Sequence, residues 1–369
     1  MKTAFFGLGL AVIAASVHGM DYEVASCAEL ADIDDTTITS LTITSSPFEC
    51  DSYTRFRVRN DMVLKSDAAV EFSNFALKVL GTLIVEPDVT FRGVSKQMTN
   101  GGALYVERDS SATFMGASSF IGNSVMSTVL PPTETPSGGF RSNYKVRSGG
   151  AVFNKGDLVF EGTANFANNE ASTLDNTDLG RGGAIYNARV GSITFNAELT
   201  ATENNADGFF SGQGGVIFNA GNIVVESTSS FTENTAADGG VIYVHPTGTM
   251  TFNGFATFTE NTCFDNRGGA ILNLGALDLF GDSLFLSNFA DSAGDGGSGG
   301  AIYNGGDLRF RGFNTFDNNW GYWGGAIFND VGASMSDFED FEFLNLRGAN
   351  CFAIYYAPDS SDSEPICAP

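Results

Sequence analysis

The chain has 369 residues, of which 43 are acidic and 19 basic, and its formal net charge is −24. A surface this acidic repels nucleic acid and anionic lipid, which excludes nucleic-acid binding as a function. After residue 19, no segment approaches the ~20 uninterrupted apolar residues that a membrane-spanning helix needs.

The N-terminal residues 1–19 have the features of a secretory signal peptide. Lys2 precedes an apolar run from Ala4 to Ala15, and small residues around Gly19 suit a cleavage site. We therefore expect a secreted protein without a transmembrane segment. Residues 20–60 are expected to form an N-terminal cap and a first coil. There Ser26 to Glu29 fits a capping box ahead of a short helix, and a strand-like run starts at Thr36.

The central region repeats one phrase, roughly GGAIYN, eight times. Its copies are GGALYV at Gly101, GGAVFN at Gly149, GGAIYN at Gly182, GGVIFN at Gly214, GGVIYV at Gly239, GGAILN at Gly268, GGAIYN at Gly299 and GGAIFN at Gly324. The shortest interval is 25 residues, found from Gly214 to Gly239 and from Gly299 to Gly324, and longer intervals contain insertions. This pattern predicts one structural coil with variable loops.

Each copy is followed by two further strand-like runs. The first alternates apolar and polar residues, as in GDLVF at Gly156, and the second ends in F-x-x-N, as in FTEN at Phe231. The coil around Ala201 keeps the Asn but lacks the Phe. Three short strands per coil, stacked through glycine and asparagine corners, predict an all-β parallel β-helix over residues 61–356. CFAIYY at Cys351 is interpreted as a terminal coil, and residues 357–369 as a cap tail.

The corner residues are expected to have separate roles. Gly-Gly permits positive φ and a close approach of neighbouring coils. The Asn of F-x-x-N tolerates the left-handed region, and its amide can bond to the amides above and below in a ladder.

The paired GGAI and F-x-x-N motifs resemble the repeat of the chlamydial polymorphic outer membrane proteins, from about Gly101 to Tyr356. The resemblance implies a right-handed, pectin-lyase-like solenoid displayed at the cell surface, with adhesion as the usual role. It favours a secreted or surface-retained protein that binds an extracellular glycan or a surface protein.

The cysteines lie mainly at the two ends of the chain. In an oxidising compartment we expect two disulfides that clamp the caps, Cys27 with Cys50 and Cys351 with Cys367. Cys263 lies inside the array, where a buried thiol is favoured over an intermolecular bridge.

Catalysis is the main alternative, because polysaccharide lyases and glycoside hydrolases share the β-helix fold. After signal removal the only histidine is His245, next to Pro246 in a corner, and a lone corner histidine is more often solvated than catalytic. The adjacent Asp34 and Asp35 belong to the cap. We therefore expect no enzymatic activity.

Three glutamates, Glu203, Glu233 and Glu260, precede the corner Asn in three consecutive coils. Their backbones are expected one strand spacing apart, where carboxylates repel one another unless a cation such as calcium intervenes. The alternative is that the long side chains extend into water. Calcium is the only ion that the sequence indicates, and no other cofactor is expected.

An aromatic binding edge is expected where insertions follow F-x-x-N. Its candidate ligand-binding residues are Tyr144, Phe209, Phe210, Trp320, Tyr322 and Trp323. Stacked corners would place them along one edge, suited to contact with a sugar or a protein. The alternative is that these rings cover the core or pack on one another.

The phrase itself poses a question of orientation, because alternation sends Ile185 and Tyr186 to opposite sides of the strand. With the isoleucines inside, an exposed apolar strip is expected, made of Tyr105, Phe153, Tyr186, Phe218, Tyr243, Leu272, Tyr303 and Phe328. With the opposite orientation, the aliphatic row is exposed. Either strip would offer a partner surface or a face for a homo-oligomer.

Overall fold

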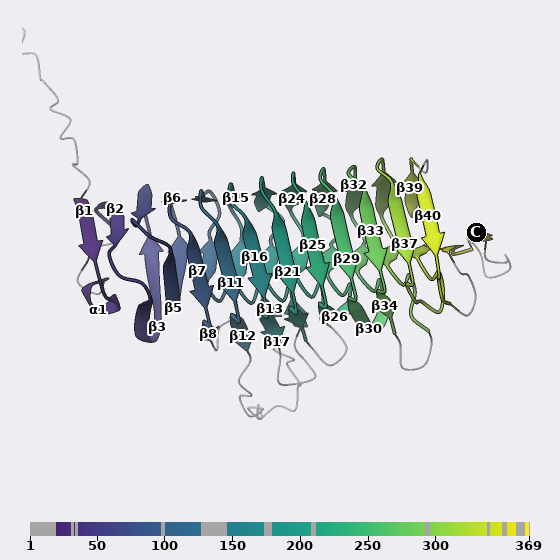
Figure 1. The fold of residues 1–369 in the computed structure, drawn as a ribbon, viewed down its shortest axis with the longest axis horizontal. Coiled ribbons are helices and arrows are strands. Elements are labelled where there is room, and N and C mark those ends of the chain that lie inside the picture. The colour runs from purple at the N-terminus through teal and green to yellow at the C-terminus, as the bar shows by residue number, and fades with distance from the viewer. Residues whose placement is uncertain are drawn as a thin grey trace, which may run out of the picture.

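The computed structural model describes residues 20–30, 33, 36–96, 100–126, 146–172, 179–207, 212–291, 296–337, 340–348, 353–358 and 366–368. Several sequence-based predictions fall outside these ranges, namely the signal peptide (1–19), Asp34, Asp35, Tyr144, Phe209, Phe210 and Cys351. The predicted parallel β-helix is confirmed. Strands at equivalent positions of successive coils pair in parallel and stack into an elongated rod (Figure 1).

The strands of the repeated phrase form one face of the rod, the GGAIYN face. It consists of β9 (Leu104–Val106), β14 (Val152–Asn154), β19 (Ile185–Asn187), β23 (Ile217–Asn219), β27 (Ile242–Val244), β31 (Ile271–Asn273), β35 (Ile302–Asn304), β38 (Ile327–Asn329) and β41 (Ile354–Tyr356). The pairing of β41 with β38 confirms the terminal coil that CFAIYY predicted.

The alternating runs form a second face of twelve strands. It consists of β1 (Met20–Val24), β2 (Ile38–Ile43), β4 (Met62–Lys65), β6 (Thr82–Val85), β10 (Ser111–Phe114), β15 (Asp157–Phe160), β20 (Ser192–Phe195), β24 (Asn222–Val225), β28 (Thr249–Phe252), β32 (Ala276–Leu279), β36 (Asp307–Phe310) and β39 (Ser334–Ser336).

The F-x-x-N runs form the third face. It consists of β7 (Val89–Arg92), β11 (Ser118–Ile121), β16 (Ala164–Ala167), β21 (Leu199–Thr202), β25 (Ser229–Thr232), β29 (Ala256–Thr259), β33 (Ser283–Leu286), β37 (Asn314–Asp317) and β40 (Phe341–Leu344). Near the N-terminus the long strands β3 (Phe48–Val58) and β5 (Val70–Val79) pair with each other. Strand β5 also pairs with both β7 and β9, which joins two faces.

A short fourth strand, which the sequence did not predict, follows the corner Asn in many coils. This sheet contains β8 (Ser95–Lys96), β12 (Ser124–Met126), β17 (Glu170–Ser172), β22 (Asn205–Ala206), β26 (Thr235–Asp238), β30 (Thr262–Arg267) and β34 (Phe289–Ala290). A separate pair is formed by β13 (Val146–Ser148) and β18 (Leu179–Arg181). In these coils, part of the segment predicted to be a variable corner is therefore regular structure.

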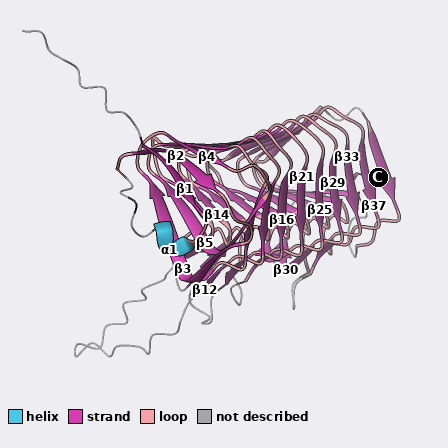
Figure 2. Ribbon diagram, turned by 60° about the vertical axis from the view of Figure 1, so that its left-hand side comes forward, coloured by secondary structure: helices cyan, strands magenta, loops and turns pink. Residues whose placement is uncertain are grey.

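The N-terminal cap contains α1 (Cys27–Leu30), the short helix that the sequence predicted, at the end of the rod (Figure 2). The Glu29 carboxylate accepts a hydrogen bond from the Ala25 backbone N–H at 2.8 Å, one residue before the Ser26 N–H that the predicted capping box would use. The disulfide between Cys27 and Cys50 is confirmed. At the other end, β42 (Ile366–Ala368) pairs antiparallel with β41.

One hydrophobic core runs through the rod. Isoleucines of the phrase, such as Ile217 and Ile242, pair in register and point inward. Phenylalanines of the F-x-x-N face stack in a second inner row, with ring centroids 4.8 Å apart for Phe285 and Phe316. Ala201 occupies the position that Phe has in both neighbouring coils, and it is buried.

The glycine corner behaves as the sequence predicts. The first glycine of all eight Gly-Gly pairs has positive φ, as in Gly214 at 69°. The second lies close to the next coil, since a Cβ on Gly215 would lie 2.1 Å from the Gly240 carbonyl oxygen. Any side chain at this position would overlap the neighbouring backbone.

The predicted asparagine ladder is also confirmed. It runs through Asn123, Asn169, Asn204, Asn234, Asn261, Asn288 and Asn319, each donating from Nδ2 to Oδ1 of the next at 2.9–3.1 Å. A second ladder, formed by the last residue of the phrase, was missed. It includes the bonds from Asn154 to Asn187 and from Asn273 to Asn304, and Val244 interrupts it.

One prediction about this corner is wrong. The left-handed residue is not the Asn but the residue before it, including Asn168, Ser287 and Asn318 at φ 54–55°. The Asn side chain must point inward to join the ladder, so the backbone turns one residue earlier.

Candidate binding surfaces

An aromatic row lies on the outer side of the GGAIYN face. Strand pairing places Tyr105, Phe153, Tyr186, Phe218, Tyr243, Leu272, Tyr303, Phe328 and Tyr355 in one register. Consecutive rings stack nearly parallel, with centroids 5.0 Å apart and an angle of 1° for Tyr186 and Phe218. The isoleucines are therefore inside and the aromatic row outside.

The expectation that this row forms an exposed strip is wrong. Phe218, Tyr243, Leu272 and Tyr303 are buried and form a small cluster separate from the main core. Each ring is covered by its neighbours in the stack, and basic side chains preceding the Gly-Gly pairs lie against the row. The Arg181 guanidinium lies 4.9 Å from the centroid of the Phe218 ring. This face therefore gives little basis for a homo-oligomer.

Charged groups beside the aromatic row are paired with one another. Arg267 donates two hydrogen bonds to Asp238, at 3.1 and 2.8 Å, and its guanidinium lies 5.6 Å from the Tyr303 ring centroid. Burial raises the pKa of Tyr303, and its hydrogen bond to Asp330 raises this pKa further. Burial and the Asp238 carboxylate raise the pKa of Asp265. The pairing of Arg267 with Asp238 therefore stabilises the position of the guanidinium group over the aromatic row.

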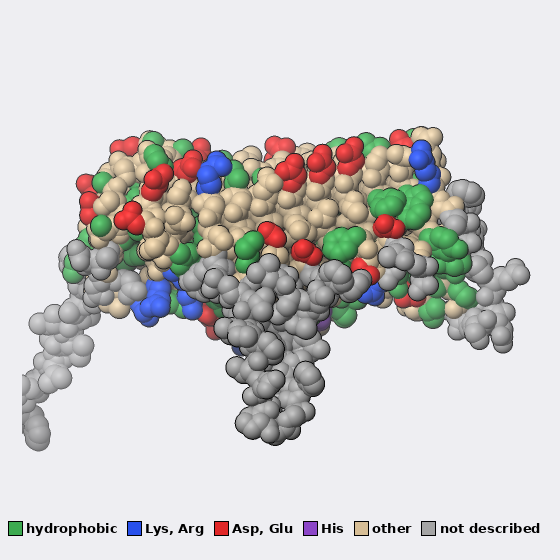
Figure 3. Space-filling model, turned by 90° about the horizontal axis from the view of Figure 1, so that it is seen from below, with side chains coloured by type: hydrophobic (Ala, Val, Ile, Leu, Met, Phe, Trp, Pro, Cys, Tyr) green, Lys and Arg blue, Asp and Glu red, His purple; other side chains and the backbone are tan. Residues whose placement is uncertain are grey.

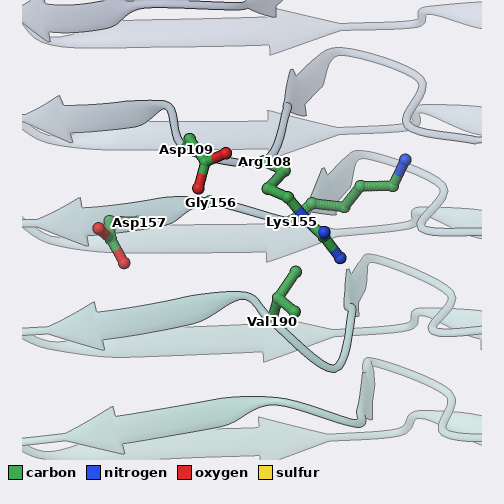
Figure 4. A pocket seen from close by; sticks show the side chains of 6 residues that line it. All are labelled: Arg108, Asp109, Lys155, Gly156, Asp157 and Val190. Carbon is green, nitrogen blue, oxygen red and sulfur yellow. The ribbon is translucent and has the colours of Figure 1, made fainter.

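A shallow hollow of about 280 Å³ lies over the turns of three successive coils (Figure 4). Its lining residues are Arg108, Asp109, Lys155, Gly156, Asp157 and Val190. Lys155 Nζ donates to the Tyr105 hydroxyl at 2.8 Å and to Glu107 at 3.3 Å. Burial acts to lower the pKa of Lys155, but these two contacts raise it above its ordinary value. The hollow is lined by both acidic and basic side chains, and the Lys155 ammonium group is already hydrogen-bonded to Tyr105 and Glu107.

Both tryptophans lie in the predicted aromatic edge. Trp320 stacks on Phe289 with ring centroids 4.6 Å apart, and Trp323 lies edge-on to Tyr322 at 5.2 Å. Tyr322 is 37% exposed, while Trp320 and Trp323 are half-buried. We call Phe289, Trp320, Tyr322 and Trp323 the aromatic edge. The rings pack on one another, as in the alternative interpretation, and still present apolar surface.

The other three residues predicted for this edge, Tyr144, Phe209 and Phe210, lie outside the described residues. Viewed from the side of β26, β30 and β34, the rod shows separate hydrophobic patches towards its C-terminal end (Figure 3).

The three glutamates lie in one row, because Thr202, Thr232 and Thr259 directly before them pair in register. Glu203, Glu233 and Glu260 all have φ of 54–55°, a conformation that non-glycine residues seldom adopt. Their side chains are exposed, as in the alternative without calcium. Among the described residues, no group of three or more acidic, histidine or cysteine side chains is arranged to hold a metal ion. The calcium site stays a prediction.

His245 lies in the turn after β27. Its Nδ1 is 3.1 Å from the Thr247 hydroxyl, and its ring centroid is 5.9 Å from that of Phe218. Partial burial lowers the pKa of His245, and Arg181 and Arg189 lower it further. The His245 Nδ1 also accepts the Thr247 backbone N–H at 3.3 Å, so the imidazole is held within its own turn.

Sequence reasoning missed a second group of rings, at the corner between the second face and the F-x-x-N face. Phe255 and Phe313 are 44% and 48% exposed there, and Phe280 is half-buried close by. The signal was present in N-G-F-A-T-F and R-G-F-N-T-F, where an extra Phe precedes the F-x-x-N strand. We call Phe255, Phe280 and Phe313 the corner rings.

Of the remaining two cysteine predictions, the structure describes the residues needed to check one. Cys263 is a buried thiol, as expected, and its Sγ lies 2.8 Å from the Ala237 carbonyl oxygen. Cys367 lies in β42, but Cys351 is outside the described residues, so the second disulfide stays a prediction.

The sequence of one coil matches a known repeat. A family model described as the Chlamydia polymorphic membrane protein repeat matches residues 228–245, which span β25, β26 and β27. The chain resembles the polymorphic membrane proteins. The match contains both motifs of this repeat, the F-x-x-N corner at Asn234 and the Gly-Gly corner at Gly239.

A curated relative of the polymorphic membrane protein type extends the similarity. Chlamydia pneumoniae "probable outer membrane protein pmp19" is 32% identical over 214 residues, which is 53% of this chain and 20% of the relative. The match thus covers about a fifth of that protein's length. No solved structure matches the chain. Within the described residues, no helix has the length and apolarity needed to span a membrane.

Proposed function

We propose that this protein is a binding rod outside the cell or at its surface, and that its aromatic edge contacts a glycan or a surface protein. The observation that carries the proposal is the group of stacked, partly exposed rings around Trp320 and Tyr322 on a rigid array of coils. Rings held in place by stacking lose little conformational freedom when a ligand covers them. The description of pmp19 as an outer membrane protein supports a surface location.

Binding of the purified protein to a glycan array and to intact cells tests this proposal. In the variant Trp320→Ala with Trp323→Ala we expect binding to fall at least tenfold, with an unchanged circular dichroism spectrum. Val331→Ala, which changes an exposed apolar residue in the turn after β38, is the matched control and should bind like the wild type. Equal binding by the double variant and the control would overturn the proposal.

We also propose that the rod acts without catalysis. Two carboxylates that lie beside basic groups are occupied, since Asp238 accepts two hydrogen bonds from Arg267 and Asp278 accepts two from Arg309. Carbohydrate hydrolysis or elimination requires an acid and a base that can exchange protons with the substrate. A reducing-sugar assay on polysaccharides should therefore give no signal above buffer, and sustained release of reducing ends would contradict this part of the proposal.

A further inference from the structure

The corner rings occupy a repeated backbone position on the rod. Phe255 and Phe313 immediately precede equivalent strands, β29 and β37, with Asp282 at the same position of the coil between them. The hydrogen bonds from Ala256 N–H to the Asp282 carbonyl and from Ser283 N–H to the Phe313 carbonyl continue this register. The position lies along the edge between the second face and the F-x-x-N face, where β28 and β32 turn into β29 and β33 (Figure 1).

This register fixes the separation of the two exposed rings. They are two coils apart, so their backbones are separated by about 9.6 Å along the rod. The parallel pairing of β29 with β33 and of β33 with β37 holds that spacing.

The surface between the two rings combines stacking and hydrogen bonding. Phe280 lies one coil before Arg311 in the adjoining row, and the Arg311 guanidinium is 4.2 Å from the Phe280 ring centroid. Among the described residues, Arg311 makes no ion pair, whereas Arg309 is held by Asp278. Asp282 Oδ1 accepts the Phe313 N–H at 2.8 Å, which fixes the corner. Arg311 thus has donors available beside the rings.

The apolar surface continues from the corner onto the neighbouring strand. Leu284 and Leu286 point outward from β33, where the preceding strand β29 has Thr257 and Thr259. Both leucines are half-buried. Apolar side chains therefore also lie on the strand that follows Asp282, beside the two rings.

These features favour a polysaccharide over a protein partner. A stable protein interface has a contiguous apolar centre, whereas the two exposed rings are separated by Asp282. The net charge of −24 opposes an anionic polymer. In an extended β-1,4-linked chain alternate sugars face the same way, and their repeat is close to the two-coil spacing. The apolar C–H face of every second sugar could then cover one ring.

We propose that the corner rings form a binding site for a neutral, extended β-1,4-linked polysaccharide lying along the rod. Phe255 and Phe313 stack on alternate sugars, and Arg311 donates hydrogen bonds to the hydroxyls between them. This site is separate from the aromatic edge of the proposed function.

Titration calorimetry with cellohexaose, chitohexaose and maltohexaose tests the site. We expect one of the two β-linked hexamers to bind, while the α-linked maltohexaose does not. Phe255→Ala and Phe313→Ala should each lower the affinity at least tenfold, whereas Phe313→Trp should retain it. Trp320→Ala with Trp323→Ala should leave it unchanged, which separates this site from the aromatic edge. Failure of the wild type to bind either β-linked hexamer, or equal affinity in the Ala variants, would overturn the proposal.

The register allows a second, sharper test of spacing. Phe313→Thr with Glu198→Phe places rings at positions 198 and 255, again two coils apart, and should recover part of the affinity lost in Phe313→Thr. Phe313→Thr with Thr228→Phe places the rings one coil apart and should not. The hydrogen bonds from Leu199 N–H to the Thr228 carbonyl and from Ser229 N–H to the Phe255 carbonyl establish these positions. If both double variants recovered the same affinity, the proposed match between the two-coil ring spacing and the repeat of the polysaccharide would be refuted.

Discussion

Single asparagines hold the corners of this rod through bonds that few other side chains could make. Asn234 is fully buried, and its amide donates to the Ala201 carbonyl and to Asn261 while its oxygen accepts from the backbone and side chain of Asn204. An amide carries donors and an acceptor on one short side chain, so it can link the coils on both sides. Such a fully satisfied network is stable, but it is costly to interrupt.

We predict that Asn234→Leu lowers the free energy of unfolding by about 3 kcal/mol, because it leaves several buried polar groups without partners. Chemical denaturation measures the effect. Asn165→Leu is the matched control, since the half-buried Asn165 side chain accepts one hydrogen bond from Thr200 on the outer surface. A loss in Asn234→Leu no larger than in Asn165→Leu would contradict the role of the ladder.

At the scale of the element, the second glycine of each pair sets how closely the coils pack. The same 2.0–2.2 Å approach to the next coil recurs at Gly183, Gly240, Gly269 and Gly300. Because the contacted atom is backbone, the neighbouring coil cannot yield without losing its own register.

Gly215→Ala should therefore destabilise the rod by about 2 kcal/mol or more through overpacking against the Gly240 carbonyl. Gly305→Ala should have a much smaller effect, since the nearest atom to its added Cβ is the end of the flexible Leu274 side chain. The melting temperatures of the two variants provide the comparison. Similar losses in both would show that backbone contact does not limit the spacing.

The sequence predicted the Gly-Gly corners well because their conformation depends on the residues at the corner itself. A Cβ would lie 2.0 Å from the Ile217 carbonyl oxygen at Gly214 and 2.1 Å from the Gly240 carbonyl oxygen at Gly215, so only glycine fits and both positions recur in the eight Gly-Gly copies of the phrase. The short strand β26 was missed because its residues, TAAD, have no strong strand preference and are set in place by pairing with β22 and β30. Phe255 and Phe313 were missed because Phe occurs at this corner position in only some coils, so the repeat pattern does not mark it.

At the scale of the whole molecule, stability is distributed along the stack. Each coil contacts mainly its two neighbours, so a local change should remain local. The N-terminal end differs from the middle because a disulfide between Cys27 and Cys50 ties α1 to β3.

We expect Cys27→Ala with Cys50→Ala to cost about 3 kcal/mol locally, from the added freedom of the unfolded cap. Hydrogen exchange should then accelerate in β1 to β3, while β25 and β29 keep the protection of the wild type. Uniformly faster exchange along the rod would instead indicate that the molecule unfolds as one cooperative unit.

The sequence by itself determined the stack and the register of equivalent strands, because the repeated glycines and alternating apolar residues recur coil after coil. It left open whether the isoleucines or the aromatic residues of the phrase face the core, and the folded structure places the isoleucines inside. Only the tertiary structure decided which outer surfaces are accessible. Phe218 is covered because the rings of Tyr186 and Tyr243 stack on its two sides and Arg181 lies over it, and Tyr243 is covered by Phe218 on one side and Leu272 on the other. Phe255 and Phe313 stay exposed because the residue between them in the stack is Asp282. Accessibility depends on neighbours that are distant in the sequence, and only the folded stack brings them together.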